Sequence, residues 1–323
     1  MQLDSSSNFS QRQQTPRSPR GLLLAGCLLL SYGVVAAGRL LAAGDTTQPA
    51  APANAAAQDD STQNDSFESV AVEEVNSAYG RLILADEPVA YWRFEETTGD
   101  FHSSVGPAGE KTPFATQTKG KVDRNLAGPG ASAMGLFSES NRAIGFTGDG
   151  ASLRIADPGD NSPFDFHAGD QITIEAWIQP GRVTDGRHMY LIGKGRTGNA
   201  GFPRENQNWA FRLRGIGGTA RLSFLYRDTT GDSPDKAQYH RWNSDEGLNS
   251  SDGKWHHVAV TYTFGEPDSA RGYLDGVETR GTWDMGGTAG KSPVVDNDEI
   301  WIGTTLGGIR GASFIGGIDE IAI

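Results

Sequence analysis

The chain of 323 residues is long enough for one large β domain or two ordinary ones, and it carries a formal net charge of −12. Its 43 glycines and 37% apolar residues are typical of short strands joined by tight turns, and this apolar content is low for a long helical protein. An acidic surface repels phosphate backbones, so the charge argues against nucleic acid as a partner.

The first 43 residues have the pattern of an export signal. A polar flank with three arginines precedes an apolar, uncharged run over residues 21–37, whose length is right for a signal peptide and marginal for a membrane-spanning helix. Arg39 interrupts the apolar stretch, which favours cleavage over retention. We therefore expect export to the periplasm, the cell envelope or the outside. Residues 1–43 are then a signal peptide or, if uncleaved, an N-terminal membrane anchor over residues 21–43 and the only membrane contact.

The only cysteine, Cys27, lies inside this apolar run. The stretch Leu24–Cys27 has the form of a lipobox, whose cysteine is lipidated. Because few apolar residues precede the cysteine and many follow it, we interpret the match as coincidence. With no other cysteine, the folded part can contain neither a disulfide nor a cysteine-based zinc site.

Residues 44–70 are rich in Ala, Pro, Gln, Asp, Ser and Thr. Such a segment cannot bury enough apolar surface to offset chain entropy, so it is predicted to be a disordered linker. Residues 71–85 form a short lead-in segment, in which we predict a helix over 71–84.

Residues 86–323 show the two-residue period of β-strands. Apolar side chains at positions 172, 174, 176 and 178 alternate with others in a pattern that suits sheets buried on one face. Asp275-Gly276 predicts a tight hairpin. Strands are predicted over residues 89–95, 143–146, 151–156, 171–178, 189–193, 208–214, 220–226, 256–263, 270–274, 277–280, 299–303 and 314–323. About a dozen short strands with no amphipathic helix between them indicate an all-β antiparallel β-sandwich or jelly roll.

Six short motifs lie on these strands: Pro88–Glu96, Gly145–Gly150, Ile172–Ile178, Asp252–Tyr262, Gly272–Gly276 and Phe314–Ile321. In this order they resemble the LamG-like jelly-roll domain of the concanavalin A-like lectin/glucanase superfamily, in the type found in exported bacterial proteins. The resemblance covers about residues 86–323 and implies the fold. It says much less about activity, because this fold hosts lectins, adhesins, enzymes and passive modules.

The end of the sequence departs from the family pattern. Family members usually continue past the last of these motifs with a further short segment, whereas this chain stops at Ile323. We expect either a minimal version of the domain or a piece of a longer, multidomain protein.

The resemblance implies a calcium site. Related jelly rolls hold one ion between an early Gly-Asp-Gly turn and an acid of the last strand, and Ca²⁺ takes several oxygen ligands at about 2.3–2.6 Å. The matching positions are Asp149 and Asp319, with Gly148 and Glu320 as further candidates. The alternative is an edge turn and an acid that accepts hydrogen bonds from neighbouring backbone. If calcium binds, we expect it to stabilise the fold.

Two other acidic runs, Asp157–Asn161 and Asp296–Glu299, are dense in oxygen ligands. Neither has the spacing of an EF-hand. We interpret both as polar turns, since their residue types favour loops.

No catalytic residue is predicted. Glycoside hydrolysis needs two carboxylates roughly 5–10 Å apart, and the glucanase motif of this fold, Glu-x-Asp-x-x-Glu, is missing from the sequence. Glu175 stands alone on its strand, and adjacent acids such as Asp319-Glu320 are expected to point to opposite faces.

Sugar binding needs exposed aromatic rings with polar groups beside them. The polar insertion 228–252 contains Tyr239 and Trp242, and Trp283 lies in another glycine-rich loop. We predict these three residues as ligand contacts, the alternative being that they pin their loops to the domain. Tryptophans within predicted strands are expected in the core or in cross-strand pairs: Trp92, Trp177, Trp209, Trp255 and Trp301.

Three hypotheses for function follow. The first is an exported recognition module of the cell envelope that binds carbohydrate or a protein partner, with a structural Ca²⁺ ion as an option. The second is a purely structural or interaction domain with no small ligand. The third, a glycoside hydrolase, lacks the carboxylate pair that it requires.

Overall fold

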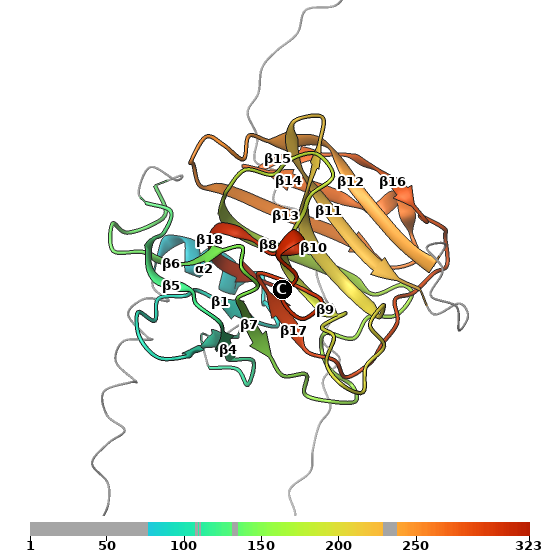
Figure 1. Ribbon diagram of the computed structural model, residues 1–323, viewed down its shortest axis with the longest axis horizontal. Helices are drawn as coiled ribbons and strands as arrows, with labels where there is room; N and C mark the ends of the chain where they lie inside the picture. The colour runs from blue at the N-terminus through green and yellow to red at the C-terminus, as the bar shows by residue number, and fades with distance from the viewer. Residues whose placement is uncertain (1–76, 107–108, 110, 131–134, 229–237) are drawn as a thin grey trace, which may run out of the picture. The chain divides into compact units, whose positions relative to one another are not determined.

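The computed structural model describes residues 77–106, 109, 111–130, 135–228 and 238–323 (Figure 1). The predicted signal or anchor, the linker, residues 71–76 and Cys27 lie outside these ranges. The described residues form two antiparallel sheets and one α-helix, which confirms the predicted all-β sandwich. No helix among them is both long and apolar enough to cross a membrane.

The first sheet has the strand order β15-β14-β13-β8-β18-β1-β3, and β6 with its neighbour β5 pairs beside β18. Strand β18 is therefore central, with β8 on one side and β6 and β1 on the other. The strands are β1 (Tyr91–Trp92), β3 (Ser104–Val105), β5 (Asp123–Ala127), β6 (Arg142–Thr147), β8 (Gln171–Pro180), β13 (His256–Thr263), β14 (Arg271–Leu274), β15 (Val277–Thr279) and β18 (Ile315–Ala322).

The second sheet has the order β16-β12-β11-β10-β9-β17-β7-β4-β2, and Figure 1 shows β9 to β12 as long neighbouring strands. Its strands are β2 (Phe101–His102), β4 (Thr116–Lys119), β7 (Ser152–Ile155), β9 (His188–Gly195), β10 (Gln207–Ile216), β11 (Thr219–Arg227), β12 (Tyr239–Leu248), β16 (Gly281–Met285) and β17 (Ile300–Ile302).

The main core lies between the two sheets and follows the two-residue period of the sequence. Phe224 and Tyr226 of β11 face Tyr262 of β13, with ring centroids 5.6 Å and 5.8 Å apart. Of the strand tryptophans, four are at most 3% exposed and Trp255 is half-buried, in line with their predicted packing role. The four are Trp92, Trp177, Trp209 and Trp301.

The predicted hairpin is present between β14 and β15. Asp275 and Gly276 both have positive φ, at 50° and 80°. Two consecutive residues with positive φ match the twist of an antiparallel pair, which is why Asp-Gly is favoured here.

A short helix, α2 (Ala78–Ala85), covers the outer face of the first sheet. The Ser77 hydroxyl accepts a hydrogen bond from the Gly80 amide at 2.9 Å and caps the helix. Tyr79 and Ile83 are buried in a second hydrophobic cluster that includes Trp177. The helix predicted over 71–84 is therefore found over its described C-terminal part.

Every predicted strand is present, but six strands were not predicted: β2, β3, β4, β5, β12 and β16. The important one is β12, because residues 228–252 were expected to be a polar loop. His240 and Trp242 of β12 are buried, whereas Tyr239 and Arg241 face the other side of the sheet. The polar residues on that outer side hid the alternation in the sequence.

Candidate functional site

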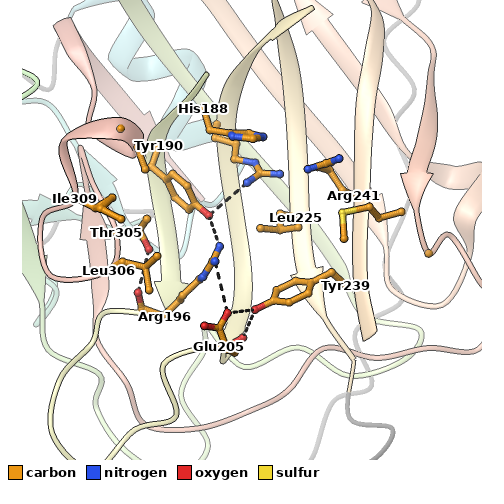
Figure 2. Close-up of a pocket in the computed structure, with 15 residues that line it drawn as sticks. His188, Tyr190, Arg196, Glu205, Leu225, Tyr239, Arg241, Thr305, Leu306 and Ile309 are labelled. Atoms are coloured by element: carbon orange, nitrogen blue, oxygen red, sulfur yellow. Dashed lines mark hydrogen bonds and ion pairs between the residues drawn. The ribbon is translucent and has the colours of Figure 1, made fainter. Parts of the chain in front are cut away.

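The outer face of the second sheet, turned away from the core, carries a cavity of about 920 Å³ (Figure 2). Side chains of β9 to β12 form its floor. The loop between β9 and β10 (residues 196–206) and the loop between β17 and β18 form its walls, the latter with the 3-10 turn η3 (Arg310–Ala312). The floor residues are Tyr190, Arg212, Leu225, Tyr239 and Arg241.

The strand period explains why these side chains meet. On β10, Phe211 and Leu213 enter the main core, so Arg212 between them must point to the outer face. The pairing register places Arg212 opposite Tyr190 on β9 and opposite Ser223 on β11. The three residues therefore form one row across the sheet.

Two of the three arginines that line the cavity have a carboxylate partner. Arg196 lies 3.6 Å from Glu205, and Glu205 also accepts a 3.0 Å hydrogen bond from the Tyr239 hydroxyl. Arg241 donates to Asp284 from Nε at 2.6 Å and from Nη2 at 2.9 Å. Figure 2 shows the Arg196–Glu205–Tyr239 chain along one side of the cavity.

Asp284 is held as an anion by this pairing. Partial burial raises its pKa, but hydrogen bonds from Arg241 and Arg214 outweigh that effect and lower the pKa of Asp284 to about 2. It is therefore charged at neutral pH.

The third arginine, Arg212, is 3% exposed. Its Nε donates to the Ser223 hydroxyl at 3.2 Å, and its Nη1 donates to the Tyr190 hydroxyl at 3.4 Å. Burial lowers the pKa of Arg212 to about 10, and the neighbouring charges of Arg241 and Arg196 act in the same direction. Within the described ranges, no carboxylate forms an ion pair with it.

His188 also lines the cavity beside the arginines, but it carries no charge at neutral pH. Burial, together with the positive charges of Arg212, Arg241 and other arginines, lowers the pKa of His188 to about 3. The imidazole is therefore neutral at physiological pH.

The sequence comparison identifies the family. The family model of the concanavalin A-like lectin/glucanases superfamily matches residues 144–323. The chain belongs to this superfamily. The resemblance read from the six strand motifs is thereby confirmed. No curated protein matches the chain.

Several solved structures are similar to the chain at low sequence identity. Domain 4 of AbnA, a GH43 extracellular arabinanase from Geobacillus stearothermophilus in complex with arabinotriose, is 14% identical, with a TM-score of 0.44 over 73% of this chain and 91% of that one. The binding domain of botulinum neurotoxin serotype D is 10% identical, with a TM-score of 0.44 over 73% of this chain and 47% of that one. The Ruminococcus gnavus IT-sialidase CBM40 is 14% identical, with a TM-score of 0.38 over 56% and 88%.

Of the three aromatic residues predicted as ligand contacts, only Tyr239 lines the cavity. Trp242 is 1% exposed and belongs to the main core, so it cannot stack on a sugar and its prediction was wrong. A Cβ on Gly281 would lie 2.5 Å from the Trp242 ring, which shows how closely the indole is enclosed. Trp283 packs against the same core, and its indole N–H donates to the Pro267 carbonyl at 3.0 Å.

The two carboxylates predicted to hold calcium are not brought together. Asp149 lies exposed in the turn after Thr147, whereas Asp319 lies beyond Ile318 on β18. Because Thr147 pairs with Ile315, at least four residue steps of ~3.3 Å separate the two acids along the strands. They cannot share one ion, which corrects that part of the prediction.

Each predicted calcium ligand already has a structural contact. Asp149 accepts from the Ala151 amide at 3.3 Å, and fully buried Asp319 accepts from the Asn141 side chain at 2.8 Å. Gly148 packs against Ile315, and Glu320 accepts from the Tyr91 hydroxyl. No group of three or more His, Cys, Asp or Glu residues in the described ranges is arranged to hold a metal. Calcium binding itself stays a prediction.

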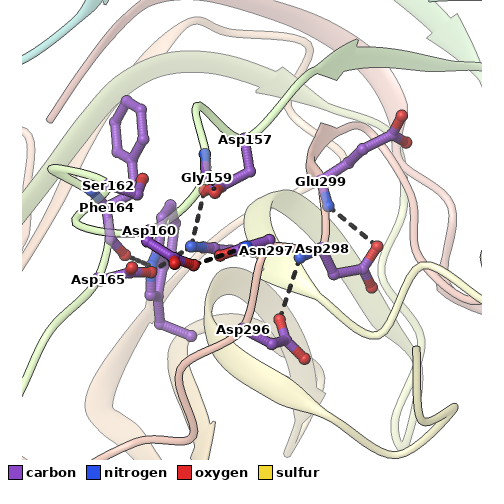
Figure 3. Close-up of polar contacts among 12 residues, drawn as sticks. Asp157, Gly159, Asp160, Ser162, Phe164, Asp165, Asp296, Asn297, Asp298 and Glu299 are labelled. Carbon is purple, nitrogen blue, oxygen red and sulfur yellow. Dashed lines mark hydrogen bonds and ion pairs between the residues drawn. The ribbon is translucent and has the colours of Figure 1, made fainter. Parts of the chain in front are cut away.

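The two acidic runs interpreted as polar turns lie side by side (Figure 3). The Asn297 side chain donates to Asp160 at 3.1 Å. Asp298 accepts from the hydroxyl and the amide of Thr197, at 2.7 Å and 3.2 Å. These contacts hold the loop that carries Arg196, in line with the polar-turn interpretation.

Most of the residues that line the cavity were not predicted from the sequence, including His188, Tyr190, Arg196, Glu205 and Arg212. One signal was available. Arg212 occupies an outward position on a strand whose inward positions are large and apolar. That pattern by itself, however, is equally typical of a sheet face exposed to solvent. What distinguishes the site is that two distant loops cover that face, and this coverage has no local signature in the sequence.

Proposed function

We propose that this protein is an exported recognition module of the cell envelope that binds carbohydrate in the cavity on the outer face of the second sheet. The observation that carries the proposal is the composition of that cavity. Tyr190, Leu225 and Tyr239, each at most 7% exposed, form the closely packed base of the cavity, and the more exposed Met285 and Ile309 add apolar surface to it. A few polar groups converge above this base. This combination of an apolar surface and a few placed polar groups is typical of small-ligand sites of 300–1,000 Å³.

The two tyrosines suit a sugar ligand. A tyrosine ring offers an apolar face for the C–H surface of a sugar, and its hydroxyl offers a polar tip. The hydroxyls of Tyr190 and Tyr239 are already oriented by Arg196 and Glu205, at 3.2 Å and 3.0 Å. Ordered polar groups beside an aromatic floor favour recognition of a hydroxyl-rich ligand.

The charges in the cavity favour binding over hydrolysis. Among the described residues that line it, Glu205 is the only carboxylate, whereas glycosidases use a pair. Asp284 lies near its edge on β16, but its low pKa and its two arginine partners make it a poor proton donor. A hydrolase is therefore the weaker alternative. The other alternative, a contact domain without a small ligand, does not require a cavity of this kind.

The cavity can be tested by filling it. Gly311 lines the cavity, and a Cβ placed there meets no atom of the described residues within 4 Å. In a glycan array followed by calorimetry with the full chain, we expect a Gly311→Trp variant to lose at least ten-fold in affinity for any glycan bound by the wild type, at an unchanged Tm. Gly130 has equally open surroundings and does not line the cavity, so a Gly130→Trp variant is the matched control.

Two results would contradict the proposal. A folded wild-type chain that binds no glycan leaves the function as a structural contact domain. Glycan binding that survives Gly311→Trp places the site elsewhere on the domain.

A further inference from the structure

The cavity has the opposite charge to the molecule that carries it. The whole chain has a formal charge of −12, yet the cavity is lined by three arginines and one glutamate. Such a local reversal attracts an anionic ligand and repels a cationic one.

Among the arginines of the cavity, Arg212 is the one without a carboxylate partner in the described ranges. Glu205 pairs with Arg196, and Asp284 pairs with Arg241 and also with Arg214. Arg212 has only the neutral hydroxyls of Ser223 and Tyr190 as partners among the described residues.

The guanidinium of Arg212 is also incompletely hydrogen-bonded. Its Nη2 is buried and has no hydrogen-bond partner in the described part of the chain, and the same holds for His188 Nε2. Burial of a charge without a counter-ion or a full set of hydrogen bonds is costly. A bound anion that accepts from Nη2 removes that cost.

We propose that the ligand is an acidic sugar, whose carboxylate is held by Arg212 and whose ring lies against Tyr190, Leu225 and Tyr239. This inference rests on the proposed carbohydrate-binding function and adds the class of the ligand. A carboxylate matches the planar fork of a guanidinium. Arg212 can hold one carboxylate, and Glu205 on the facing side disfavours a second acidic group.

The proposal predicts a large selectivity. Removing one partner of a buried, charge-assisted pair reduces affinity by about 50-fold or more. In calorimetry with the full chain, we expect sugars with a uronic or sialic acid residue to bind at least about 50-fold more tightly than the same sugars with the carboxylate reduced to an alcohol.

Three variants test the assignment to Arg212. Arg212→Met should abolish the preference for the acid, and Arg212→Lys, which keeps the charge but not the fork, should keep only part of it. Arg221 is the matched control, because it lies on β11, bonds the Ser244 carbonyl at 3.2 Å and does not line the cavity. Arg221→Met should bind like the wild type.

The outcomes separate this inference from the proposed function. If acidic and neutral sugars bind equally and Gly311→Trp abolishes both, the cavity is a glycan site and the inference is wrong. If only sulfated sugars bind, the anion is not a carboxylate and the inference is also wrong. If an acidic sugar binds equally well to the wild type and to Arg212→Met, the anion is held elsewhere. If no sugar binds at all, the proposed function itself fails.

Discussion

Replacement of Arg212 by methionine should make the ligand-free protein more stable. Burial lowers the pKa of Arg212 from 12.5 to about 10, which corresponds to ~3 kcal/mol against the charged form in the folded state. Methionine has a similar length and no charge to desolvate. The substitution also takes a hydrogen-bond donor away from the Ser223 and Tyr190 hydroxyls, which lie 3.2 Å and 3.4 Å from the guanidinium, and the loss of a donor costs about 1 kcal/mol at each hydroxyl.

The free energy of unfolding of Arg212→Met should therefore exceed that of the wild type by about 1–2 kcal/mol, which corresponds to a rise in Tm of about 3–6 °C. Because the folded-state pKa lies below the unfolded one, the cost applies at every pH below about 10. The gain should therefore be the same at pH 6 and pH 8. Differential scanning calorimetry of the full chain measures it, with Arg221→Met as the control that changes little.

A lower Tm in Arg212→Met would contradict this prediction, because it would show that the contacts of Arg212 outweigh its desolvation. A second measurement, of Tm in the presence of sugar, separates the effect of the Arg212 charge from that of its packing. An acidic sugar should raise the Tm of the wild type further as its concentration increases, and it should raise the Tm of Arg212→Met no more than the matching neutral sugar does.

Two further predictions concern stability. Trp242→Ala removes a side chain that is 1% exposed, so we expect denaturant titrations to show a loss of about 3–5 kcal/mol in the free energy of unfolding. A variant that loses sugar affinity but no stability would contradict the core position of Trp242. Because the pKa of His188 is lowered from 6.5 to about 3, the unfolded chain binds a proton that the folded chain does not between these values. Stability should thus fall by up to ~4 kcal/mol from pH 6.5 to pH 3, and this part of the decline should be missing in His188→Gln.

The fold was predictable because its signals are local. Alternation in β8 or β11 and the Asp275-Gly276 turn each depend on residues a few positions apart, and each is present in the structure. Strand β12 was not predicted, because its inward residues, His240 and Trp242, alternate with polar ones in a segment rich in charged residues and serine. Composition concealed the period there.

The candidate site was not predictable in the same way. Arg212, Glu205 and the η3 loop are separated in sequence, and their meeting depends on the pairing register of four strands. The prediction of a shared calcium ion failed for a different reason. It transferred a family pattern to Asp149 and Asp319, whereas the spacing along β6 and β18 sets them apart.

The central place of β18 in the first sheet has a consequence for how the molecule is made. Tyr91 of β1 pairs with Ala322 of β18, and β18 also separates β8 from β1 and β6. Among the described strands of this sheet, β18 is the last to be synthesised, so β8 and β1 have no partner between them until β18 has been made. Pairings over such a sequence distance also form slowly. We therefore expect the first sheet to close only after β18 has been synthesised, with the facing edges of β8 and β1 open to chaperones until then.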